Sequence, residues 1–290
     1  MIAAANVANQ TTTVYVPLTF WFCNNVGLAL PLIALQYHEV KINIELASLT
    51  EISYSDSETT ITDITGETVS SIVDVAADPV TLAAPATGTL ADISVAPSGS
   101  PVSRVELWAD YIYLDVDERK RFAQVSHEYL IDQLQFVGSS SIQANATRHS
   151  NTLTFNHPVK ELLWVFKSAA NSNKVGLWLP HSAAPISSVE MKLNGHDRFS
   201  PREGKYFNLI QPFQHHTACP PVNGGLYVYS FALKPEEHQP SGTCNFSRID
   251  NAQLNFTGTF PGTSSICKVF ATNYNILRVI SGMGGLAYSS

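Results

Sequence analysis

Charged side chains are scarce in this chain of 290 residues: Asp, Glu, Lys and Arg make up 14% of it, against about 25% in ordinary soluble domains. Basic residues are fewer than acidic ones, with 17 Lys and Arg against 24 Asp and Glu. The basic face of a nucleic-acid-binding protein is therefore not expected, and we predict no direct contact with nucleic acid. Hydrophobic residues, at 44%, are ample for a core.

Lys and Arg are absent from residues 49–103, a segment rich in Ser, Thr and Ala that holds eight acidic residues. Without this segment the chain has 17 basic and 16 acidic residues, since 24 minus 8 is 16. The rest of the chain is thus nearly neutral. We interpret residues 49–103 as an acidic surface insertion, which either carries short strands of its own or is partly disordered.

Cysteine is also sparse, and the four cysteines form no CxxC pair. They are Cys23, Cys219, Cys244 and Cys267. This spacing argues against a zinc site, a redox motif and a dense disulfide framework, so reduced, buried thiols are expected. The start of the chain lacks the plan of a signal peptide. The apolar run 14–35 is interrupted by Pro and Gly, so no transmembrane segment is predicted.

Catalytic motifs are missing. His38-Glu39 and His127-Glu128 do not continue to HExxH, because isoleucine stands where the second histidine would be needed. We expect these two pairs to pack within strands or at a joint between domains. No catalytic residue, metal ligand or cofactor is predicted.

Three other motifs have structural explanations. His215 and His216 are adjacent rather than spaced, so a role in a loop or an interface is expected. Asp197 and Arg198 follow the turn signal Asn194-Gly195 and are expected to stabilise a loop or pair across an interface. The sequence Gly282-Met283-Gly284-Gly285 has no helix after it, so a mobile tail is predicted rather than a phosphate loop.

What the chain does contain is strand patterns. Val40, Ile42, Ile44 and Leu46 alternate with polar residues, which is typical of a half-buried strand. The run 14–35 before them is apolar on both faces, so its second face needs a cover from another layer, domain or subunit.

Strands are predicted along most of the chain, separated by turn signals, with one short helix. The helix is expected at 118–124 after Asp117, because acids precede bases there. About eight strands in the second half indicate a β-sandwich of jelly-roll type. The predicted strands are 14–22, 28–38, 39–48, 105–115, 128–137, 151–156, 159–167, 174–179, 187–194, 224–233, 244–257 and 266–280.

Four N-glycosylation sequons occur, and Asn145, which lies in the most loop-like context, is the first candidate for modification. The others begin at Asn9, Asn245 and Asn255.

Several long blocks resemble one family, the double jelly-roll major capsid proteins of nucleocytoplasmic large DNA viruses that infect algae and protists. The resemblance runs from about residue 14 to the last residue, apart from 49–103. The blocks are VPLTFWFCNNVGLALPLIALQYHEVKINIELAS, WADYIYLDVDERKRFAQVSHEYLIDQLQF, NGHDRFSPREGKYFNLIQPFQ, GGLYVYSFALKPEEHQPSGTCNFSRIDNAQLNF and NYNILRVISGMGGLAYSS.

The resemblance implies a structural protein of the virion, assembled inside the host cell, rather than an enzyme. It implies homotrimers that form pseudo-hexagonal capsomers of an icosahedral shell, with neighbouring capsomers and minor capsid proteins as partners. On this basis residues 1–116 are the later strands of a first jelly roll, 117–126 the joint with its short helix, and 127–290 the second jelly roll. The early strands that the family carries ahead of residue 14 are expected to be lacking, so that the first barrel is incomplete.

A carbohydrate-binding jelly roll is the alternative from a different class, because aromatic side chains can stack on sugars. Trp108, Trp164 and Trp178 are available for this, but each falls in an apolar strand pattern that favours burial. A third alternative, an enzyme of the cupin type, lacks the His-x-His motif that its metal needs.

Overall fold

The computed structural model describes residues 13, 15–44, 104–168, 186–220, 225–260 and 264–288, and the backbone of strands β1 (Ser55–Thr62) and β2 (Thr68–Val75). β1 and β2 pair antiparallel, with Ser55 opposite Val75 and Thr62 opposite Thr68. The predicted insertion therefore contains strands of its own, which is one of the two alternatives expected for it.

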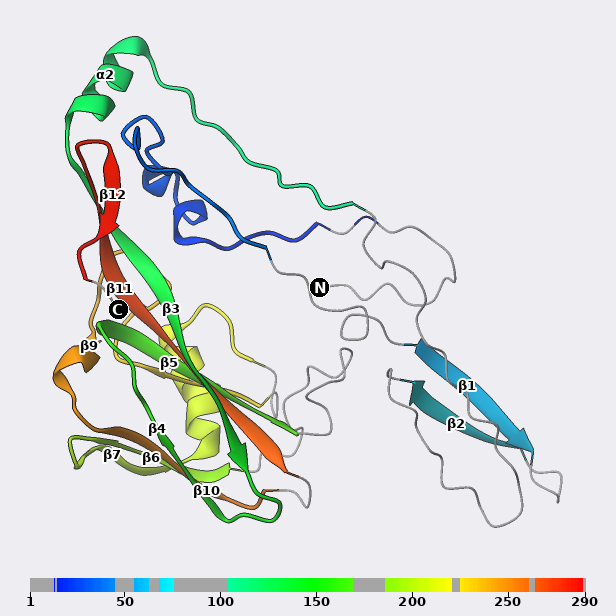
Figure 1. The fold of residues 1–290 in the computed structure, drawn as a ribbon. Helices are drawn as coiled ribbons and strands as arrows, with labels where there is room; N and C mark the ends of the chain where they lie inside the picture. The colour runs from blue at the N-terminus through cyan, green and yellow to red at the C-terminus, as the bar shows by residue number, and fades with distance from the viewer. Residues whose placement is uncertain are drawn as a thin grey trace.

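The described residues between 127 and 286 form a two-layer antiparallel β-sandwich (Figure 1). One layer has the strand order β3-β11-β5-β8 and the other β4-β10-β6-β7. The short strands β9 and β12 extend the first layer alongside β5 and β11. The strands are β3 (His127–Ile142), β4 (Arg148–Thr152), β5 (Pro158–Ser168), β6 (Ile186–Leu193), β7 (His196–Glu203), β8 (Leu226–Ser230), β9 (Cys244–Asn245), β10 (Ala252–Gly258), β11 (Ser265–Ile280) and β12 (Met283–Leu286).

The order of these strands is that of a jelly roll. Leaving out β9 and β12, the first layer contains the first, eighth, third and sixth strands along the chain, and the second layer the second, seventh, fourth and fifth. Chain segments thus cross repeatedly between the layers, as two nested Greek keys require. The predicted jelly-roll sandwich is confirmed for this part of the chain.

Most of the strands predicted beyond residue 127 are present, with shifted ends. The prediction at 151–156 lies mostly beyond β4, and the one at 244–257 is split into β9, the 3₁₀ turn η4 (Phe246–Arg248) and β10. The predicted strand 174–179 lies outside the described residues. β7 was missed, because HDRFSPRE is polar and contains proline, a composition suited to the sheet edge that β7 occupies.

The core lies between the two layers and is rich in aromatic rings. Strand β10 shows why the layers pack: every second side chain from Ala252 to Gly258 is buried, as the two-residue period requires. Trp164 of β5 is fully buried, with Phe207, Tyr227 and Phe256 around it at ring-centroid distances of 5.4, 6.1 and 6.1 Å. Burial raises the pKa of Tyr227 to about 12.

The turn between β6 and β7 has the local chemistry that its sequence predicts. Asn194 and Gly195 both have positive φ, 51° and 81°, which is the backbone of a type I′ hairpin turn. The Asn194 side chain also accepts hydrogen bonds from the backbone N–H groups of Asp250 and Asn251. Asn194-Gly195 therefore forms the predicted turn and also anchors the start of β10.

The helices in the described part of the chain are few and short. Helix α2 (Val116–Gln124) begins two residues earlier than predicted, because Asp115 rather than Asp117 caps it by accepting a hydrogen bond from the Val116 N–H. The π-helix η3 (Tyr206–Ile210) leads into α4 (Gln211–His215), and η1 (Trp21–Cys23) and η2 (Val26–Leu28) are single 3₁₀ turns.

Strands β3 and β11 are each 16 residues long and extend beyond the sandwich as a two-stranded ribbon (Figure 1). β11 pairs with β5 only as far as Asn273, whereas its pairing with β3 continues to Val279. The extension carries β12 and leads through β3 to α2. Residues from 15–44 contact it, so the ribbon connects the sandwich to the first part of the chain.

Candidate assembly surface

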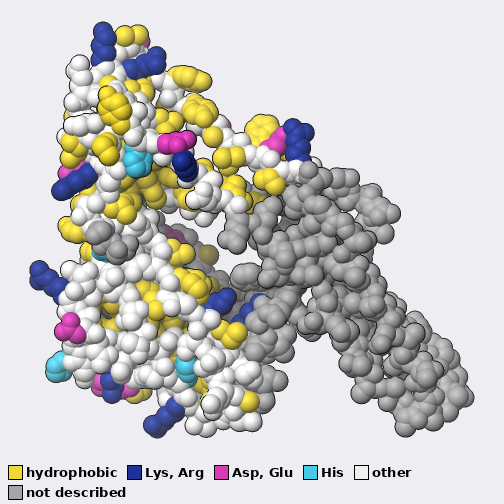
Figure 2. Space-filling model, viewed as in Figure 1, with side chains coloured by type: hydrophobic (Ala, Val, Ile, Leu, Met, Phe, Trp, Pro, Cys, Tyr) yellow, Lys and Arg dark blue, Asp and Glu magenta, His cyan; other side chains and the backbone are white. Residues whose placement is uncertain are grey.

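The first part of the chain exposes a large apolar surface, formed by residues 15–44 and 104–116, which we call the assembly surface. Trp108 and Tyr113 are 81% and 92% exposed. Figure 2 shows hydrophobic side chains gathered along this region. Its exposed large apolar residues are Tyr15, Val16, Leu18, Phe20, Val26, Leu32, Tyr37, Val40, Ile42, Ile44, Val105, Leu107, Trp108, Tyr111, Ile112, Tyr113 and Val116.

The strands predicted in this region are wrong for the residues that are described. Residues 15–44 contain only turns and the 3₁₀ helices η1 and η2, and residues 104–115 contain no helix or strand. Val40, Ile42 and Ile44 are exposed instead of half-buried. The physical reason is that a strand needs a hydrogen-bonded neighbour, and no described segment pairs with these residues.

Residues 34–37 are the part of this region that packs against strand β11 and the turn that follows it. Ala34 and Leu35 are buried against Val279 and Leu277 of β11, and the Tyr37 N–H donates a hydrogen bond of 2.9 Å to the carbonyl of Gly282. The predicted mobile tail at 282–285 is therefore wrong, since β12 pairs with β11 and receives this segment. The prediction of a mobile tail depended on the glycine-rich composition of residues 282–285. Glycine also occurs where another backbone approaches closely, so this composition does not by itself indicate mobility.

Gly282→Ala is expected to loosen this docking by about 1–2 kcal/mol. Gly282 has φ of +83°, and an added Cβ would lie 2.5 Å from the Tyr37 ring. Gly285→Ala is the matched control, because nothing lies within 4 Å of its Cβ position. Limited proteolysis within residues 38–44 should accelerate in Gly282→Ala only, and equal rates in the two variants would contradict the assignment.

The pair His127-Glu128 lies where α2 meets β3. The His127 Nε2 atom is 2.8 Å from the Phe122 carbonyl oxygen, and its ring stacks on the Phe122 ring at 5.0 Å. Glu128 pairs with Arg278 of β11 at 2.9 Å. The expected packing role is confirmed for this pair. His38-Glu39 is exposed on segment 38–44, outside any strand, where Glu39 pairs with Lys41, so the expected packing is wrong for this pair.

His215 and His216 connect the end of α4 to the segment that follows β8. The His215 Nδ1 atom is 2.9 Å from the Leu233 carbonyl oxygen, and the His216 Nδ1 atom is 3.2 Å from Glu236 Oε1. The expected loop role is confirmed. Asp197 pairs with Lys192 across the β6–β7 hairpin, so its expected stabilising role is confirmed as well.

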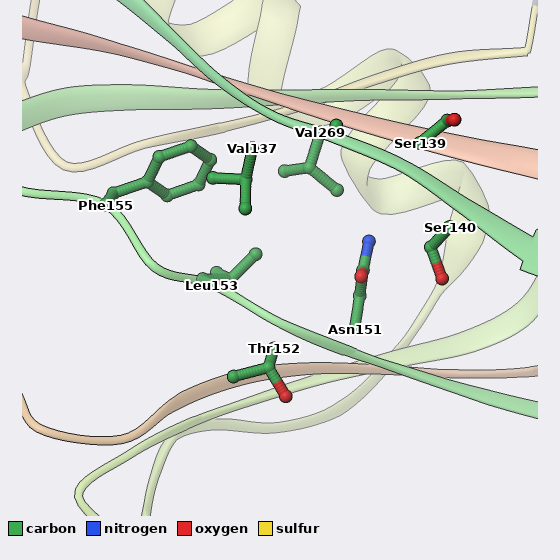
Figure 3. Close-up of a pocket in the computed structure, with 9 residues that line it drawn as sticks. Val137, Ser139, Ser140, Asn151, Thr152, Leu153, Phe155 and Val269 are labelled. Atoms are coloured by element: carbon green, nitrogen blue, oxygen red, sulfur yellow. The ribbon is translucent and has the colours of Figure 1, made fainter.

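A small pocket opens between β3 and β4 (Figure 3). Its volume is about 70 Å³, well below the 300–1,000 Å³ of ordinary ligand sites. Ser140 and Asn151 line it, and their polar atoms have partners in the fold: Ser140 Oγ is 2.9 Å from His149 Nε2, and Asn151 Nδ2 donates to Cys267 Sγ. The pocket therefore offers no catalytic constellation.

The four cysteines are free, as predicted, but their burial differs. Burial raises the pKa of the Cys267 thiol to about 12, so this thiol is inert at neutral pH. Cys23 and Cys219 are exposed, so the expectation that all four are buried is wrong.

In the described part of the chain no group of three or more His, Cys, Asp or Glu could hold a metal ion. None of the described helices is long and apolar enough to span a membrane.

The sequons and tryptophans differ in their surroundings. Asn145 is exposed in the turn between β3 and β4, with φ of 58°. The Asn255 amide, by contrast, is hydrogen-bonded to Glu190 and Ser150. Trp164 lies in the core and cannot stack on a sugar, Trp178 lies outside the described residues, and Trp108 is exposed within the assembly surface.

Comparison with known proteins identifies the family. A family model described as large eukaryotic DNA virus major capsid protein matches residues 118–285, and one described as major capsid protein N-terminus matches residues 1–115. The major capsid protein of Pyramimonas orientalis virus is 46% identical over 99% of this chain and 65% of its own length. That of Paramecium bursaria Chlorella virus 1 is 38% identical over 95% of this chain and 66% of its own length.

A solved structure supports the same class. A quasi-atomic structure of the PBCV-1 virus capsid superposes with a TM-score of 0.54 at 39% sequence identity, covering 62% of this chain and 56% of that chain. The fold class is thus the all-β double jelly roll of capsid proteins. The chain belongs to the major capsid protein family of large eukaryotic DNA viruses.

The relatives that this chain matches are major capsid proteins of large DNA viruses. The chain spans 65% of the length of the Pyramimonas orientalis virus relative. The predicted family and fold class are both confirmed.

Proposed function

We propose that this chain is a shell-building subunit that forms homotrimers, each a pseudo-hexagonal capsomer of an icosahedral capsid. It binds neighbouring capsomers and minor capsid proteins and performs no catalysis. The observation that carries the proposal is the assembly surface, where apolar side chains from two distant segments are left uncovered. Exposed apolar side chains gathered in one region, as in Figure 2, are typical of protein–protein contact.

The proposal divides the chain as the family resemblance implies. Residues 1–116 contribute later strands of a first jelly roll, 117–126 are the joint that contains α2, and 127–290 are the second jelly roll. The alternating sequence at 40–46 supports this division, because it is the pattern of a strand although no described segment pairs with it.

Sedimentation equilibrium of the full chain tests the proposal. A trimer is expected, because neighbouring subunits would cover the exposed apolar side chains of the assembly surface. Stable interfaces of this kind bury on the order of 2,000 Å² or more. Trp108→Asp should weaken association at least tenfold by placing a charge within the apolar surface, a cost of about 1.4 kcal/mol or more. Ala144→Asp, which places the same charge on the exposed β3–β4 turn, is the matched control. A chain that stays monomeric at high concentration would contradict the proposal.

We also propose Asn145 as a glycosylation site. Its side chain is exposed on a turn, which is the kind of position that glycosylating enzymes reach. Intact mass of virion-derived protein should exceed the sequence mass, and Asn145→Gln should remove the difference. An unmodified mass would refute the assignment.

A further inference from the structure

Residues 287 and 288, which we call the strap, follow β12 and bond to β11 at the place where β11 leaves the sandwich. β12 itself lies beside the part of β11 that extends beyond the sandwich (Figure 1). Among the described strands, β11 pairs with β5 as far as Asn273 and with β12 from Leu277 onward. A strand edge left open between these residues would expose unpaired backbone groups. The strap fills this interval.

The strap is held by one backbone bond and one side chain. The Ala287 N–H donates a hydrogen bond of 2.8 Å to the carbonyl of Ile276. One residue further on, the side-chain amide of Asn275 takes the place of a strand backbone. Its Nδ2 donates to the carbonyl of Tyr288 at 2.9 Å, and its Oδ1 accepts from the Tyr288 N–H at 3.4 Å. Asn275 thus extends the pairing of β12 with β11 to the end of the strap.

The same Asn275 side chain also connects β11 to β3. The residue is 2% exposed. Its Nδ2 donates to Gln133 Oε1 of β3 at 3.0 Å, and its Oδ1 accepts from the Ile276 N–H at 2.8 Å. An asparagine amide has two N–H donors and an oxygen with two lone pairs, so these bonds together with those to Tyr288 use its full capacity. A buried amide with every group satisfied fixes β3, β11 and the strap relative to one another.

The ring of Tyr288 reaches the sandwich. Its centroid lies 6.3 Å from that of the His157 ring, and His157 is the residue before β5. His157 is itself held in place, because its backbone N–H donates to Ser247 Oγ at 2.8 Å and its carbonyl accepts from the Phe246 N–H at 3.1 Å. The strap therefore contacts the ribbon through its backbone and a fixed corner of the sandwich through its ring.

The docking of residues 34–37 depends on the strands that the strap holds. Leu35 packs against Val279 of β11, and the Tyr37 N–H donates to the carbonyl of Gly282. Gly282 lies in the turn between β11 and β12. If β12 separated from β11, this turn would move and the docking contact would be lost.

We infer that the strap locks the β3–β11 ribbon to the sandwich, with Asn275 as the positioning residue. By holding β12 against β11, the strap also keeps residues 34–37 docked, although it contacts none of them in the bonds described above. The lock is a property of the single subunit, so it does not depend on the trimer proposed for this chain.

Backbone hydrogen exchange of the full chain, followed by mass spectrometry, tests the strap. Asn275→Leu keeps the bulk of the side chain but leaves both backbone groups of Tyr288 unpaired. Exchange should accelerate at least tenfold in peptides covering 274–280 and 34–38, because more than one hydrogen bond is lost. Peptides from β5 should keep the wild-type rate, which shows that the sandwich remains folded.

Asn255→Leu is the matched control for Asn275→Leu. It makes the same change on β10 of the other layer, where the Asn255 amide bonds to Glu190 and Ser150. Exchange in the 274–280 and 34–38 peptides should stay at the wild-type rate in this variant.

Ala287→Pro tests the strap without changing a buried side chain. Proline removes the N–H that bonds to Ile276, so exchange in the 274–280 and 34–38 peptides should accelerate about fivefold, the size expected for one hydrogen bond. Ala287→Ser keeps this N–H and should keep the wild-type rates. The inference is overturned if either peptide exchanges at the wild-type rate in Asn275→Leu or Ala287→Pro. Equal rates in Ala287→Pro and Ala287→Ser would overturn it as well.

Discussion

Trp164→Ala is expected to destabilise the sandwich by about 3–5 kcal/mol, the range for removing a large aromatic side chain from a core. Trp164 is fully buried on β5, and its ring faces Phe207, Tyr227 and Phe256. Its alanine variant leaves a cavity that rigid neighbouring strands cannot fill. Since a whole domain is stable by only about 5–15 kcal/mol, a large share of the unfolding free energy should be lost, as measured by urea unfolding followed by circular dichroism.

Two further tryptophan variants distinguish the loss of packing in the core from the loss of an exposed side chain. Trp164→Phe should cost far less, about 1 kcal/mol, because it keeps a ring and removes an indole N–H that is buried without a hydrogen-bond partner. Trp108→Ala should leave the unfolding free energy of the isolated subunit unchanged, because that side chain is 81% exposed. If Trp108→Ala destabilised the subunit as much as Trp164→Ala, the assignment of one to the core and the other to the assembly surface would be wrong.

Asp132→Ala is expected to cost about 3 kcal/mol, because it leaves the ammonium of Lys160 buried without its counter-ion. The Lys160 side chain is 6% exposed and its Nζ lies 3.1 Å from Asp132 Oδ2 and 5.3 Å from the Tyr274 ring centroid. The aromatic ring offers only a weak substitute for the carboxylate. Thermal unfolding at pH 7 measures the loss.

The matched control for Asp132→Ala replaces both partners. Asp132→Leu combined with Lys160→Met keeps apolar bulk and removes both charges, so its stability should be within about 1 kcal/mol of the wild type. A double variant as unstable as Asp132→Ala would mean that the cost comes from packing rather than from the unpaired charge.

The sandwich could be predicted from sequence wherever a strand or turn has a clear local pattern, even where its partner strand is distant in the chain. The alternation in β10, the alternation at the start of β11 and the Asn194-Gly195 turn are local signals, and the structure agrees with each of them. β7 was missed because an edge strand tolerates polar residues and proline.

The assembly surface shows where local signals are insufficient. Residues 40–44 have the alternation of a strand, yet strand formation also requires a hydrogen-bonding neighbour, and no sequence pattern supplies one. The contacts of His216 could not be predicted either. Glu161, His216 and Glu236 are far apart in sequence, and only the packing of β5 against the end of α4 brings them together. Their spacing resembles no motif.

The docking of residues 34–37 on the β11–β12 hairpin has a consequence for biosynthesis. The ribosome makes the apolar segment early, whereas the hairpin that receives it is made only after nearly all of the sandwich strands. During that delay Ala34, Leu35 and their neighbours face the cytosol uncovered, and exposed apolar segments in nascent chains are prone to aggregate. Aggregation of the nascent chain is therefore a hazard until translation reaches β12, and any cover over residues 34–37 during that time would reduce it.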